Sequence, residues 1–178
     1  MLRTRTLIGV ALVAALIPTL LAGCGGSDID SSALASTKAP AQLLRNSISS
    51  HVPKFDVQKL GEADDLSVGC GDNGIMRSWR SSQLIFVKPT QAAHVERLLA
   101  DLSSVLSING WKAVDDTPSD NIHESKLTST KTSSTILLTA TGASDDAGNG
   151  ASMEIVVTGP CVKTDGPNSD EVKHLENR

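Results

Sequence analysis

The stretch Thr135-Ile136-Leu137-Leu138-Thr139-Ala140-Thr141 decides how the rest of the chain must fold. Apolar and hydroxyl-bearing side chains alternate along most of it, and residues 151–158 repeat the pattern. The apolar positions are Ile136, Leu138 and Ala140, then Met153, Ile155 and Val157. Because successive side chains of a strand point to opposite faces, both stretches predict one sheet with an apolar face and a polar face. Helices must cover the apolar face, while the other face meets water.

Two amphipathic helices are predicted to cover that face. One runs from Pro40 to just before Pro53, and the other follows Thr90 and ends at Asn109-Gly110. Further strands are expected at the end of residues 75–87 and in 111–114 and 123–130, with the first two joined by a right-handed parallel crossover. The predicted fold is therefore an α+β two-layer sandwich, with a mixed, mostly antiparallel sheet of about four or five strands and two helices on one face.

Composition divides the chain into four parts. Residues 1–23 are expected to be a signal peptide, 24–38 a flexible tether, 39–162 a single α+β domain, and 163–178 a polar disordered tail. Inside the domain, we expect a short strand around residues 55–60 and an acidic loop at 61–65.

The first two dozen residues carry the features of an export signal. Arg3 and Arg5 precede an apolar run that is interrupted by Pro18 and is too short for a membrane span. The run ends in Leu21-Ala22-Gly23-Cys24, which resembles the lipobox of bacterial lipoproteins. The resemblance implies cleavage before Cys24, a diacylated Cys24 that binds membrane lipid, and a location on the extracytoplasmic face of the cell membrane. The alternative is an ordinary secretory signal with a chance cysteine.

The remaining cysteines, Cys70 and Cys161, are left as a pair once Cys24 is acylated. In an oxidising compartment such a pair predicts a disulfide, and the alternative is two free buried thiols. Cys70 precedes the first of the main predicted strands and Cys161 follows the last, so these two strands are predicted to be antiparallel neighbours.

Charge and composition exclude several partners. Removal of residues 1–23 takes away two arginines and no acid, which leaves 14 basic against 20 acidic residues and a net charge of −6. A chain of this kind has no basic block for nucleic acid. Aromatic residues make up only 2% of the sequence, which disfavours sites that stack sugars or bases.

No motif predicts catalysis, a metal or a cofactor. The chain lacks G-x-S-x-G and S-x-x-K, and its four histidines do not have the spacing of a zinc site. One local cluster, Arg77, Trp79 and Arg80, is a candidate patch for an anionic ligand, and its alternative is a set of ordinary surface residues.

The whole plan resembles the small exported lipoproteins of actinobacteria, including the mycobacterial LppA type, through Cys70, Trp111, Gly159, Pro160 and Cys161. That resemblance implies a location rather than a chemistry. We therefore expect a non-catalytic module that binds an envelope protein or wall polymer through the polar sheet face. A carrier of a lipid or small apolar ligand is the second hypothesis, disfavoured by the small number of large apolar residues, and an enzyme is the third.

Overall fold

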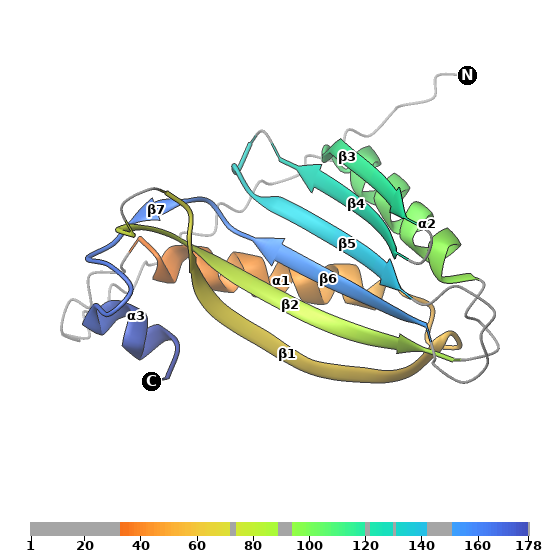
Figure 1. The fold of residues 1–178 in the computed structure, drawn as a ribbon, viewed down its shortest axis with the longest axis horizontal. Helices are drawn as coiled ribbons and strands as arrows, with labels where there is room; N and C mark the ends of the chain where they lie inside the picture. The colour runs from red at the N-terminus through yellow and green to blue at the C-terminus, as the bar shows by residue number, and fades with distance from the viewer. Residues whose placement is uncertain are drawn as a thin grey trace, which may run out of the picture.

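A computed structural model describes residues 33–71, 74–88, 94–119, 122–129, 131–141 and 151–177, without the side chains of 115–119. It is an α+β structure with a seven-stranded sheet and three helices (Figure 1). The helices are α1 (Ala35–Ser50), α2 (Val95–Ile108) and α3 (Asp170–Leu175). The strands are β1 (Val57–Gly69), β2 (Met76–Val87), β3 (Lys112–Ser119), β4 (Ile122–Thr128), β5 (Thr135–Thr141), β6 (Ser152–Thr158) and β7 (Val162–Lys163).

The sheet has the strand order β1-β2-β6-β5-β4-β3, with β7 paired to the end of β2, and every pairing is antiparallel. The prediction of α+β is confirmed, whereas the prediction of a mixed sheet with fewer strands is wrong. β2 and β6 are antiparallel neighbours as predicted. The two strands on either side of α2, β2 and β3, do not pair with each other, because β6, β5 and β4 lie between them. Alternating directions nevertheless leave β2 and β3 pointing the same way.

The alternating side chains of β5 and β6 form the centre of the core. Ile136 lies opposite Val157, and Leu138 lies opposite Ile155, all with at most 1% of their surface exposed. α1 and α2 lie behind the sheet in Figure 1, against this apolar side. Burial of each such side chain stabilises the fold by about 1.5–3 kcal/mol, so this face of the sheet anchors both helices.

α1 starts earlier than predicted. The tether was expected to reach residue 38, but α1 begins at Ala35, and Leu34 is fully buried. Lys38 donates a hydrogen bond from Nζ to the Leu175 carbonyl (2.6 Å) and lies 4.6 Å from the centre of the Trp79 ring. These contacts supply the order that the polar local sequence does not predict.

The predicted acidic loop at residues 61–65 is also wrong, since β1 continues through it. The pairing with β2 shifts register between Leu60 and Ala63, so an irregularity accommodates the glycine. Asp65 then lies opposite Ser81 and accepts a hydrogen bond from Arg45 of α1 at 3.1 Å. A partner from another element therefore keeps this acid within a strand.

The C-terminal tail, expected to be disordered, forms β7 and α3 instead. Ser169 caps α3 by accepting a hydrogen bond from the Val172 amide, and the Val172 side chain is fully buried. Glu171 accepts a hydrogen bond from the Leu34 amide at 3.3 Å. The tail therefore packs against the start of α1. There, α3 accepts hydrogen bonds from the Leu34 amide and the Lys38 side chain.

Candidate functional site

The residues proposed as an anionic patch do not come together. Arg77 and Trp79 lie on one face of β2 and Arg80 on the other, as strand alternation requires. Arg77 is buried and donates hydrogen bonds to the Ser67 hydroxyl and carbonyl. Trp79 is fully buried, whereas Arg80 is half-exposed and lies 3.7 Å from Glu154. The cluster is therefore no surface patch.

Trp79 instead belongs to a polar network under α1. Its Nε1 donates to Oδ1 of Asp65 at 3.2 Å, and Arg45 donates to the other oxygen. Burial alone would raise the pKa of Asp65, but the side-chain dipoles of Ser81, Trp79 and Gln42 and the charge of Arg45 outweigh it, so the pKa is lowered. The Ser81 hydroxyl acts through its dipole, because its geometry falls short of a hydrogen bond. This network joins α1 to the sheet.

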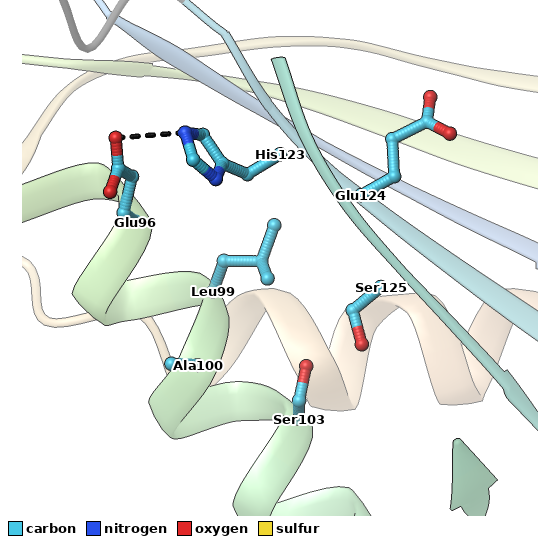
Figure 2. Close-up of a pocket in the computed structure, with 7 residues that line it drawn as sticks. All are labelled: Glu96, Leu99, Ala100, Ser103, His123, Glu124 and Ser125. Carbon is cyan, nitrogen blue, oxygen red and sulfur yellow. Dashed lines mark ion pairs between the residues drawn. The ribbon is translucent and has the colours of Figure 1, made fainter. Parts of the chain in front are cut away.

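A cleft of about 420 Å³ lies between α2 and β4 (Figure 2). Nε2 of His123 lies 2.9 Å from Oε1 of Glu96 and ties the strand to the helix. Ser103 and Ser125 also line the cleft, and the buried Oγ of Ser103 has no hydrogen-bond partner. These are the residue types of a nucleophile, a base and an acid.

The arrangement of the cleft does not assemble those types into a catalytic set. Within the described residues, neither serine hydroxyl makes a hydrogen bond with His123, and Figure 2 shows the Leu99 side chain between the histidine and the serines. A serine nucleophile requires a base within hydrogen-bond reach. The cleft can hold a small polar molecule, but its geometry does not activate a serine.

A second concave surface, the α1 groove, runs along one side of α1. It is defined by Pro40, Leu44, Ile48, Leu102, Val105 and Trp111. Two hollows of about 400 and 310 Å³ form it, and they share Leu44 and Trp111. The first lies between α1 and α2, and the second continues towards the ends of β5 and β6.

The lining of the α1 groove is uncharged. It contains no Asp, Glu, Lys or Arg, although these make up 20% of the sequence. Polar groups lie at its two ends: Ser36 and Ser134 at one, His51 and Asn109 at the other. Apolar lining with a few polar groups is the usual character of a ligand site.

Sequence reasoning missed this groove. Leu43 in α1 and Ile108 in α2 are 69% and 83% exposed, and Val105 is 38% exposed. Apolar residues beyond the buried stripe of each helix were the available signal. Their meaning depends on how α1 and α2 pack together, which no local pattern specifies.

Cys24 lies outside the described residues, so its acylation stays a prediction. Cys70 and Cys161 form a disulfide with an S–S distance of 2.03 Å. Among the described residues, no group of three or more His, Cys, Asp or Glu side chains is placed to hold a metal ion. No helix in the described ranges has the length and apolar character needed to cross a membrane.

Comparisons with protein-family models, with curated proteins and with solved structures found no match for this chain.

Proposed function

We propose that this protein is a lipid-anchored, non-catalytic binding module on the extracytoplasmic face of the cell membrane. The disulfide between Cys70 and Cys161 is the observation that carries the proposal, because such bonds persist in oxidising compartments and are rare in the cytosol. Both cysteines are exposed, so they would meet the redox conditions of their compartment directly. The signal-like residues 1–23 and the lipobox cysteine Cys24 support the same location.

Binding is favoured over catalysis by the contrast between the two concave surfaces. The α2–β4 cleft holds His123 and two serines without a hydrogen bond between them. The α1 groove is apolar in its middle and polar at its ends, which suits an amphiphilic ligand. The groove lies on the surface between elements and does not hollow out the core. The chain therefore does not need extra large apolar residues to line a cavity in addition to those that form its core.

Fractionation of cells that make the wild-type chain or Cys24→Ser tests the anchor. We expect the wild type to sediment with membranes and to resist a high-salt wash, because a diacyl anchor is held by apolar burial rather than by charge. We expect the variant to lose the shift in mass that acylation causes. Recovery of unacylated wild type in the soluble fraction would overturn the proposal.

The face of the sheet opposite the helices is a second candidate surface. In Figure 1 no described helix covers the face of β4, β5 and β6 that points away from α1 and α2. It carries both charge signs, including the pair Arg80–Glu154, and none of the tryptophans. Phe86 of β2 lies on the same face as Arg80 and is partly exposed. Mixed charge with this one phenylalanine and neither tryptophan fits an envelope protein better than a wall saccharide.

A photoreactive amino acid tests this surface when it is placed at Thr139, which points to this face, or at Ser104, an exposed control on α2. Protein adducts in cells that form from Thr139 and not from Ser104 would support contact through the sheet. Equal labelling from both positions, or adducts only with saccharide, would contradict it.

A further inference from the structure

The α1 groove has the length of an acyl chain. From Ser36 to His51, the helix that forms its wall extends about 22 Å at 1.5 Å per residue. One acyl chain spans about 15 Å, half of the roughly 30 Å hydrocarbon core of a bilayer. A single extended chain therefore fits along α1 with space for a polar head at one end.

Exposed apolar side chains continue the groove at its rims. Leu43 lies one helical turn before Ser47, and Ile108 lies three residues after Val105, so each borders the lining on its own helix. Contiguous apolar surface of this kind marks a binding site for apolar partners. The groove and its rims would therefore bury a flexible hydrocarbon chain along much of its length.

Positive charge lies beside the uncharged lining. Lys112 directly follows Trp111, and Lys131 directly precedes Thr132, and both lysines are exposed. The exposed acid Asp101 directly precedes Leu102, which lines the other hollow. In an acidic chain, two lysines next to an apolar groove favour a ligand whose head is negative.

The position of the groove relative to the tether indicates where such a ligand would come from. Ser36, which lines one end, is twelve residues after Cys24, and the nine residue-to-residue steps from Cys24 to Ala33 span at most about 32 Å when fully extended. If Cys24 is anchored as proposed above, the end of the groove stays close to the membrane surface.

We propose that the α1 groove binds the acyl chain of an anionic single-chain amphiphile, such as a long-chain fatty acid, that is separate from the protein's own anchor. The inference rests on the proposed function for its membrane source. The lining and rims hold the hydrocarbon chain, and Lys112 and Lys131 attract the head.

The test supplies cells that make the full chain with a long-chain fatty acid bearing a diazirine and a terminal alkyne, followed by irradiation and peptide mapping. We expect light-dependent adducts on peptides of α1 and the C-terminal half of α2. Label on Cys24 that forms without light reports acylation and tests the anchor separately. Groove adducts without label on Cys24 would support the groove and overturn the anchor.

Paired variants make the result specific. Ser47→Trp places a ring in the groove, whereas Ala39→Trp places it on an exposed side of α1 that does not line it. We expect Ser47→Trp to lower groove adducts about tenfold, as when about two methylenes lose their burial, and Ala39→Trp to leave them unchanged. Lys112→Glu with Lys131→Glu should lower them as well, while Lys126→Glu, in β4, should not.

Three outcomes would overturn the inference. Adducts spread evenly over surface peptides would show that the groove has no preference for the probe. Adducts unchanged in Ser47→Trp would place the chain elsewhere. Groove peptides cross-linked through the probe to the peptide that carries Cys24 would show that the occupant is the protein's own anchor.

Discussion

The indole Nε1 of Trp79 in β2 donates a hydrogen bond of 3.2 Å to the carboxylate of Asp65, which lies within the long strand β1. Arg45 of α1, whose side chain is only 7% exposed, binds the other oxygen at 3.1 Å. A buried arginine left without its acid is costly, so the carboxylate determines how firmly α1 is held.

Replacement of this acid should therefore destabilise the fold. We expect Asp65→Asn to lower the free energy of unfolding by about 3 kcal/mol at neutral pH, the low end for a buried pair, because the Asp65 side chain is 21% exposed. Urea unfolding measures the loss. Asp64→Asn, at the exposed neighbouring position, is the control and should change stability by less than about 0.5 kcal/mol.

The same pair predicts a dependence on pH. Folding lowers the pKa of Asp65 below its ordinary value of 3.8. The carboxylate therefore contributes to the free energy of unfolding above pH 3.8, and this contribution is lost as the pH falls through the folded pKa. The difference in stability between wild type and Asp65→Asn should therefore shrink between about pH 5 and pH 2. A difference that stays constant over this range would contradict the assignment.

Ser103 provides a test of the α2–β4 cleft. Its Oγ is buried without a partner, so Ser103→Ala should stabilise the fold by about 1–2 kcal/mol, through removal of an unsatisfied hydroxyl and a gain in helix propensity. Ser107→Ala is the matched control on α2, since that exposed hydroxyl already bonds to a carbonyl and should gain at most about 0.5 kcal/mol. Melting temperatures measure both, and a loss of stability in Ser103→Ala would show that the hydroxyl has a partner in solution.

The packing of the tail can be tested through α3. Val172 is fully buried, so Val172→Ala should cost about 1–3 kcal/mol through lost burial and a small cavity. Lys173→Ala, next to it and half-exposed, should change stability by less than about 0.5 kcal/mol. Urea unfolding measures both substitutions. Equal effects would show that the tail is disordered, as its composition predicts.

The predictable parts of the fold are those that the local alternation of apolar and polar residues indicates. The alternation around Ile136 and Leu138 identified the central strands and their buried face, and the position of two cysteines identified β2 and β6 as neighbours. Both features depend on a short stretch or a single covalent constraint. These two predictions therefore do not depend on how the remaining elements are arranged.

The parts that were missed depend on contacts between distant segments. Asp65 stays in a strand because of Arg45, twenty residues away, and Leu34 becomes ordered through Glu171, 137 residues away. Strand propensity and composition contain neither contact. The α1 groove was missed for the same reason, because one of its hollows lies between α1 and α2 and the other between α1 and the ends of β5 and β6.

Loss of the disulfide should weaken the fold without changing the order of its strands. Cys70 and Cys161 are 91 residues apart, and in the chain-entropy model a bond that closes such a loop stabilises by about 4–5 kcal/mol. The strands that it links are also held by the ladder between β2 and β6, which the bond does not create. We therefore expect Cys70→Ala with Cys161→Ala to fold with a lower urea midpoint, and reduction of the wild type to give the same midpoint. Two titratable thiols in the folded, untreated protein would contradict both the bond and the oxidising compartment inferred from it.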